Sequence, residues 1–194
     1  MANVTAIILA AGTSSRMGEA NKLLLDFKGQ PIVKWVIDSV QESSIEELVV
    51  VGSELSLDHL KHLVPSDSLL VENQEYKSGM TSSIKAGVRV ANKSNAIMIC
   101  LGDLPLLKTD SINLILEAYH DNSDRIVLPS HNGRRGNPVI FPPDFRSAIL
   151  EHQEPEGCKG IVQMNKDRVL LVEVDSSVLK DIDTSDQYED LLRD

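Results

Sequence analysis

Apolar residues recur along the chain in two alternating patterns. Short unbroken runs rich in Val, Ile and Leu predict strands that are buried on both faces, and apolar residues spaced three or four positions apart predict helices. We expect strands at residues 6–11, 48–51, 69–71, 96–101, 125–128, 138–141 and 169–174. We expect helices that begin after 29–31 and at 57–64, 82–91, 111–119, 145–151, near 161 and from 184. A short strand-like piece is predicted at 22–27.

The alternation of strands and helices predicts an α/β fold. Consecutive β-α-β units favour a mostly parallel sheet with helices on both faces, which gives a three-layer α/β/α arrangement joined by right-handed crossovers. The sequence of 194 residues contains no internal repeat and no low-complexity linker. We therefore predict one domain that spans residues 1–194 and buries its core without disulfides or a structural metal.

Charge and composition argue against several classes of protein. The formal net charge is -10, so broad attraction to nucleic acid or anionic lipid is not expected, although a local basic pocket is compatible with it. No apolar run reaches the roughly 18 residues of a membrane span, and no charged side chain precedes the first apolar run as in a secretory signal. We therefore expect a cytoplasmic protein that binds neither nucleic acid nor membranes.

The loop after the first strand has the composition of a triphosphate site. It begins where the apolar run stops, and it carries small and hydroxyl-bearing residues followed by two cations. Loops at the carboxyl ends of parallel strands bind ligands in open α/β sheets. Backbone N–H groups and hydroxyls would hold phosphate oxygens, and the cations would add positive charge. The expected nucleotide-binding residues of this segment are Leu9, Ala10, Ala11, Gly12, Thr13, Ser14, Ser15, Arg16 and Lys22.

A carboxylate follows the central strand. Asp103 comes directly after the apolar run 96–101, so it is expected at the same edge of the sheet as the first loop. Gly102 leaves backbone room and Pro105 stiffens the turn, which fixes the direction of the carboxylate. Mg²⁺ prefers such sites, with one or two carboxylates completed by water and nucleotide phosphates. A second carboxylate, Asp183, directly precedes a Thr–Gln capping box, and both a plain helix start and a ligand role are open for it.

Two further segments carry polar residues suited to ligands. Asn73 follows a strand, and residues 79–83 begin a helix whose N–H groups and hydroxyls would face an anion or a ribose. Ordinary N-capping is the alternative interpretation of that segment. Residues 131–138 form a Gly-rich polar loop in which Arg134 and Arg135 are available for an anionic second substrate.

The first loop resembles the signature of the molybdenum cofactor guanylyl- and cytidylyltransferases, a family of NTP transferases. The matching positions are Leu9, Ala10, Ala11, Gly12, Ser14, Arg16, Met17, Gly18 and Lys22. Later motifs of the family are matched by Asn73, Gly79, Met80, Ser83, by the Gly-Asp-x-Pro segment at 102–105, by 133–138 and by 181–184. The resemblance covers nearly the whole chain. It implies a Rossmann-like nucleotidyltransferase fold.

The resemblance also implies an activity, a cofactor and roles for residues. A Mg²⁺-dependent enzyme of this family would transfer CMP from CTP to the phosphate of molybdopterin and release pyrophosphate, with a molybdenum hydroxylase as a further partner. The implied catalytic residues are Lys22, Arg16 and Asp103, and the implied metal ligands are Asp103 and Asp183. Nucleotide binding would include Asn73, Gly79 and Ser83, and acceptor binding would involve Arg134, Arg135, Asn137 and Lys159.

Two features bear on the substrates. Ala11 and the Gly-Asp-Leu-Pro sequence at 102–105 are closer to the cytidylyl than to the guanylyl form, which favours CTP. Cytidylyl relatives commonly carry Gly-Asp-x-Gly-Ala-Arg where this chain has residues 157–162, so the acceptor stays open, with Lys159 as a substitute cation. The alternatives are an NTP transferase for a sugar or polyol phosphate, or a nucleotide-binding subunit that delivers cofactor to a molybdenum hydroxylase.

Overall fold

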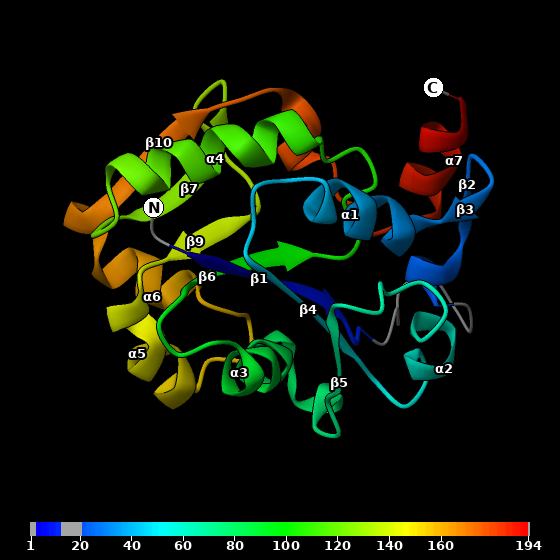
Figure 1. Cartoon of the computed structure of the whole chain (residues 1–194). Coiled ribbons are helices and arrows are strands. Elements are labelled where there is room, and N and C mark those ends of the chain that lie inside the picture. The colour runs from blue at the N-terminus through cyan, green and yellow to red at the C-terminus, as the bar shows by residue number, and fades with distance from the viewer. Residues whose placement is uncertain (1–2, 13–20, 194) are drawn as a thin grey trace.

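The computed structural model of the chain describes residues 3–12 and 21–193. Its main sheet has eight strands: β1 (Val4–Ala10), β4 (Glu47–Gly52), β5 (Leu69–Glu72), β6 (Ala96–Leu101), β7 (Ile126–His131), β8 (Arg134–Arg135), β9 (Val139–Phe141) and β10 (Val169–Glu173). The order is β10-β7-β9-β6-β1-β4-β5 (Figure 1). Strand β8 pairs with β7. The small strands β2 (Asp26–Phe27) and β3 (Gln30–Pro31) form a separate hairpin.

Helices cover both faces of the sheet, as the sequence predicts. One face carries α1 (Ile32–Gln41) and α4 (Thr109–Asp121), and the other carries α3 (Met80–Val90), α5 (Arg146–Glu151) and α6 (Lys159–Met164) (Figure 1). The short α2 (Leu57–Leu60) follows β4, and α7 (Ser185–Arg193) lies near the β2–β3 hairpin (Figure 1). The expected three-layer, mostly parallel α/β fold is therefore confirmed.

Strand β1 explains why the sheet has two cores. All seven of its residues are buried, and successive side chains point to opposite faces because a strand has a period of two. Ile8 therefore packs in the core beneath α1 and α4, and Ile7 packs in the core beneath α3 and α5. An unbroken apolar run is the composition that such a doubly covered strand requires.

The sheet departs from the purely parallel pattern at β9. Strands β1, β4, β5 and β6 pair parallel with one another, whereas β9 pairs antiparallel with both β6 and β7. The connection from β7 to β9 is too short for the dozen or more residues that a parallel crossover needs. The chain therefore turns back through β8, and β9 enters the sheet in the opposite direction.

Several element boundaries differ from the sequence prediction. Residues 22–27 do not form one strand, because a 3₁₀ helix at Lys22–Leu24 precedes β2. Helix α2 ends at Leu60, whereas the apolar spacing predicted a helix that continued to residue 64. Within the described residues, no helix has the length and apolar character needed to cross a membrane.

Candidate functional site

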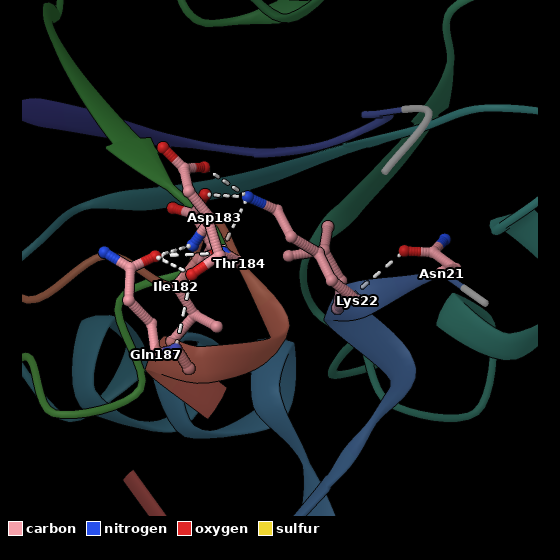
Figure 2. Close-up of polar contacts among 8 residues, drawn as sticks. Asn21, Lys22, Ile182, Asp183, Thr184 and Gln187 are labelled. Atoms are coloured by element: carbon pink, nitrogen blue, oxygen red, sulfur yellow. Dashed lines mark hydrogen bonds and ion pairs between the residues drawn. The ribbon is translucent and has the colours of Figure 1, made fainter. Parts of the chain in front are cut away.

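A lysine ammonium lies between two carboxylates at the edge of the sheet. The Nζ of Lys22 donates to Oδ2 of Asp103 at 2.7 Å, to the main-chain oxygen of Ile182 at 2.8 Å and to Oδ1 of Asp183 at 2.9 Å. Lys22 and Asp183 are 161 residues apart in the sequence. Figure 2 shows the lysine side chain reaching across from its short helix to the segment that precedes α7. The fold thus brings the expected cation and both expected carboxylates to one point.

Parallel pairing of β1 and β6 places Asp103 at this point. Leu9 is in register with Leu101, and the N–H of Gly102 donates to the Leu9 oxygen at 3.1 Å. A Cβ atom on Gly102 would lie only 2.7 Å from that oxygen, so the close approach requires a glycine. The end of β1, where the first loop begins, and Asp103 therefore lie at the same edge of the sheet, as the sequence predicts.

Lys22 and Asp183 are each fixed by a helix cap. Oδ1 of Asn21 caps the 3₁₀ helix that begins with Lys22. At the start of α7, Oε1 of Gln187 accepts from the N–H of Asp183 at 2.7 Å and from the N–H of Thr184 at 2.9 Å, and the Thr184 hydroxyl accepts from the N–H of Gln187 (Figure 2). The predicted capping box is therefore present, and it orients the segment that carries Asp183.

Burial and ion pairing oppose each other in this cluster. Burial lowers the pKa of Lys22, but the charges and hydrogen bonds of Asp103 and Asp183 outweigh it and hold that pKa above its usual value. Burial raises the pKa of Asp103, and the favourable charge of Lys22 only partly offsets this. Lys22 is therefore an ammonium at neutral pH, which suits it to neutralise negative charge and not to act as a base.

The carboxylates fit a hard divalent cation. Oδ1 of Asp103 is buried and has no hydrogen-bond partner among the described residues, which is costly for a carboxylate oxygen. The described part of the chain contains no group of three or more His, Cys, Asp or Glu residues arranged to hold a metal ion. Mg²⁺ does not need such a group, because it usually binds one or two carboxylates together with phosphates and water. Asp103 and Asp183 are the two carboxylates of this cluster that would form such a pair.

A cleft of about 1060 Å³ surrounds the cluster. Its volume slightly exceeds the range of about 300–1,000 Å³ that single small-molecule sites occupy, so it has room for a nucleotide and a second ligand. Many of the expected site residues line it, namely Leu9, Ala11, Gly12, Lys22, Gly79, Ser83, Asp103, Arg135, Asn137, Lys159 and Asp183. Thr13, Ser14, Ser15 and Arg16 lie outside the described residues.

Three expected binding residues do not line the cleft. Ala10 is buried in the core beneath α1. Asn73 is buried behind the cleft wall, where its Nδ2 donates to the hydroxyls of Ser82 at 2.8 Å and Ser83 at 3.0 Å, so it supports the wall rather than forming it. Arg134 is exposed, and neighbouring residues of a strand point to opposite faces, so only Arg135 of the arginine pair faces the cleft.

The far wall of the cleft joins α3 to residues 154–157, which lead into the segment 157–162 whose sequence departs from the cytidylyl pattern. Gly79 has a φ of 110°, and a Cβ there would lie 2.7 Å from the Pro155 oxygen. The hydroxyl of Thr81 donates to the Glu154 oxygen and accepts from the N–H of Gly157 at 3.1 Å. Residues 154–157 are therefore held against the start of α3 mainly by backbone groups.

Sequence reasoning missed some of the cleft. Tyr76, Lys77 and Glu156 also line it, and no motif singled them out. The Ile182 oxygen that contacts Lys22 has no signature in the sequence, because every residue carries a main-chain carbonyl. Asp181 lines the cleft as well, and its closeness to Asp183 in the sequence was the signal available for it.

Comparison with models of known protein families identifies the family to which this fold and site belong. Residues 6–169 match the model of the MobA-like NTP transferase domain. The chain belongs to the MobA-like NTP transferase family. Two relatives of this MobA-like chain match 97% of it: the nicotine blue oxidoreductase of Paenarthrobacter nicotinovorans, at 27% identity over 96% of that protein, and the molybdenum cofactor cytidylyltransferase of Escherichia coli, at 25% identity over 95% of that protein.

Solved structures share the fold of this MobA-like domain. A protein of Mycobacterium tuberculosis H37Rv superposes with a TM-score of 0.85 at 20% identity, covering 100% of this chain and 98% of that one. A complex of that protein with manganese has a TM-score of 0.76 at 18% identity, with 100% and 99% of the two chains covered. A nucleotidyl transferase from Methanothermobacter has a TM-score of 0.83 at 22% identity, and the match covers 98% of each chain.

Proposed function

We propose that this NTP transferase is a Mg²⁺-dependent cytidylyltransferase that moves CMP from CTP to the terminal phosphate of molybdopterin. The observation that carries the proposal is the meeting of Lys22 with Asp103 and Asp183 at the strand edge of a cleft large enough for two ligands. A cation and paired carboxylates are the groups that phosphoryl chemistry requires for charge neutralisation. The name of one relative denotes an oxidoreductase, so family membership alone does not decide the reaction.

The proposed reaction needs no nucleophilic residue from the protein. A phosphate oxygen of the acceptor attacks the α-phosphorus of CTP, a new P–O–P bond forms, and the bond to the departing pyrophosphate breaks. A phosphate monoester is ionised near neutral pH and is already a competent nucleophile, so positioning and charge neutralisation carry the catalysis. The raised pKa of Lys22 keeps the required positive charge in place.

Each residue of the strand edge would contact a different part of the nucleotide. Lys22 would stabilise the charge on the α-phosphoryl oxygens, and Arg16 with the amides of the first loop would bind the β- and γ-phosphates. Asp103 and Asp183 would hold Mg²⁺, which when bound neutralises charge on the phosphates and aligns them. Because Oδ1 of Asp103 has no hydrogen-bond partner among the described residues, turning this carboxylate toward a cation would break only the contact of Oδ2 with Lys22.

The choice of substrates follows from the sequence and from one relative. Ala11 and the Gly-Asp-Leu-Pro segment at 102–105 are closer to the cytidylyl pattern, and the Escherichia coli relative carries the name of a molybdenum cofactor cytidylyltransferase. On the acceptor side, Arg135 and Lys159 bring positive charge and Asn137 brings amide hydrogen bonds to the cleft. These groups suit a phosphate-bearing acceptor.

A product assay tests the proposal. The purified chain is incubated with Mg²⁺, molybdopterin and each of the four ribonucleoside triphosphates, and the mixture is scored for pyrophosphate and for product mass. We expect pyrophosphate and the mass of the cytosine dinucleotide with CTP. Absence of pyrophosphate with every nucleotide would refute molybdopterin as the acceptor, and preferential use of GTP would refute the choice of base.

The altered segment at 157–162 supports a second candidate acceptor. It lacks the acidic and the terminal basic residue of the cytidylyl pattern, and Lys159 is its one cation. An acceptor with a simpler recognition requirement, such as a sugar or polyol phosphate, is therefore the runner-up. CTP-dependent release of pyrophosphate with these phosphates, but not with molybdopterin, would establish it. Tight CTP binding without any turnover would instead favour a delivery subunit for a molybdenum hydroxylase.

A further inference from the structure

The oxygens around Lys22 form a ready cage for a cation. Oδ2 of Asp103, the Ile182 oxygen and Oδ1 of Asp183 all lie 2.7–2.9 Å from the Lys22 Nζ. Figure 2 shows the lysine directed at Ile182 and Asp183. An ammonium is a donor without acceptor capacity, and these three oxygens all accept hydrogen bonds from it. Two carboxylates and a carbonyl are also hard oxygen donors of the kind that a divalent cation takes.

Lys22 and a divalent cation cannot share this cage. A Mg²⁺ ion lies about 2.1 Å from its oxygens, so an ion bound to Asp103 and Asp183 would overlap the space that the ammonium fills. The two cations would also repel each other at a few ångströms in a partly buried setting, where the lysine side chain is 15% exposed. Occupation by one therefore excludes the other.

The other oxygen of Asp103, Oδ1, cannot bind a cation in the cleft while Oδ2 stays bound to Lys22. This Oδ1 is buried and unpartnered among the described residues, so it reaches a cation in the cleft only if the carboxylate turns. Turning the carboxylate breaks the 2.7 Å contact between Oδ2 and Lys22. Asp183 is more exposed, at 42% of its side chain, and is able to follow either cation.

We propose that Lys22 competes with a divalent cation for Asp103, Asp183 and the Ile182 oxygen, so that the metal site forms only when the ammonium leaves it. The inference builds on the proposed function, in which phosphates of the nucleotide offer Lys22 a different anion. Nucleotide would then draw the lysine from the cage as the metal enters, and the nucleotide and the metal would bind together. Lys22 thereby sets the order of binding in addition to neutralising charge.

Direct metal binding tests the competition without any turnover. Binding of Mn²⁺ is followed by the paramagnetic resonance signal of the free ion, in the absence of nucleotide, for the wild type and for Lys22→Met. We expect the variant to bind Mn²⁺ at least about tenfold more tightly, because hydrogen bonds from a charged donor no longer hold the carboxylates. Mn²⁺ should also raise the melting temperature of the variant more than that of the wild type. Lys22→Gln, which keeps a neutral donor, serves as a second variant if the first is poorly folded.

Two further variants locate the effect. Lys22→Met combined with Asp103→Asn should lose the gained affinity, whereas Lys108→Met, which breaks the ion pair of Lys108 with Asp175, should bind Mn²⁺ as the wild type does. Unchanged Mn²⁺ affinity in both Lys22 variants would overturn the proposal, and so would a gain that survives the Asp103 substitution.

Repeating the Mn²⁺ measurement with nucleotide present tests this inference separately from the proposed function. A non-hydrolysable CTP analogue should tighten Mn²⁺ binding by the wild type. If the analogue has no effect while Lys22→Met still gains affinity, the competition stands and the assignment of CTP as substrate is refuted.

Discussion

The two ends of the cleft are held in different ways. At the strand edge, short ion pairs join Lys22 to Asp103 and to Asp183. Asp103 follows a central strand that pairs with β1, and Asp183 precedes the capped helix α7. At the far end, Arg135 and Lys159 come from a two-residue strand and a six-residue helix. Charged contacts on a rigid sheet fix geometry closely, whereas short peripheral elements tolerate change. We therefore expect substitutions at the strand edge to abolish the reaction and substitutions at the far end to alter the choice of acceptor.

The largest expected effect lies at the strand edge. Asp103→Asn removes a charge that holds Lys22 and is proposed to hold the metal, so turnover should fall by about a hundredfold or more. Lys22→Ala should do the same. The measurement is pyrophosphate release at saturating CTP and acceptor, with circular dichroism to confirm the fold. Asp58→Asn, which removes an exposed carboxylate paired with Lys61, is the matched control and should have no effect. Near-normal turnover in either site variant would refute the catalytic assignment.

The next effect lies in the far wall. Gly79→Ala places a Cβ atom 2.7 Å from the Pro155 oxygen at a φ of 110°, so the variant should lose about 2 kcal/mol of unfolding free energy. Gly133→Ala shares a positive φ, of 76°, but its Cβ meets no atom within 4 Å, so it should cost only about 1 kcal/mol. Urea denaturation compares the two. Equal losses would show that residues 154–157 do not press on α3.

Adjacent arginines give the sharpest comparison at the far end. Arg135 lines the cleft and Arg134 does not, so Arg135→Ala should raise the KM for the acceptor by about tenfold, the value of one charge-assisted hydrogen bond. Arg134→Ala changes the net charge equally and should leave that KM within about twofold of the wild type, as expected of an exposed surface charge. Equal effects of the two would mean that the arginines act only through the overall field. The KM for CTP should not change in either variant.

A smaller effect is expected where the strand edge is oriented indirectly. Gln187→Ala leaves the N–H groups of Asp183 and Thr184 without their side-chain acceptor, which should cost about 1 kcal/mol of stability. Because Asp183 then loses its orientation, kcat should fall several-fold while the KM for the acceptor stays constant. Gln187→Glu retains an acceptor oxygen and should restore most of the activity. A rise in acceptor KM with unchanged kcat would contradict the positioning role.

The two ends of the cleft also differ in how far the sequence could predict them. The position of Asp103 was predictable because an apolar run of the right length ends just before it, and parallel strands end at one edge. The reversed direction of β9 and the unequal placement of Arg134 and Arg135 depend on hairpin register, which the local sequence does not determine. The contact between Lys22 and the Ile182 oxygen depends on packing between segments that are 160 residues apart. Sequence therefore predicts the strand edge better than the far end of the cleft.

The smallest expected effect is a loss of stability at low pH in the 3₁₀ helix that contacts Asn137 at the far end of the cleft. Asp175 caps the 3₁₀ helix at Ser176–Leu179, whose Val178 oxygen accepts from the N–H of Asn137 at 3.1 Å. Burial alone would raise the pKa of Asp175, but hydrogen bonds from Ser177 and the charge of Lys108 lower it to about 2.

Because the pKa of Asp175 in the folded state lies below the ordinary value of 3.8 for an aspartate, its contribution to stability is complete above that value and is lost as the pH falls towards about 2. Asp175→Asn should therefore flatten the dependence of unfolding free energy on pH between these values, by less than about 1 kcal/mol because the side chain is partly exposed. Denaturation series at several pH values measure this slope. Identical slopes in the variant and the wild type would show that the support of Asn137 does not depend on this carboxylate.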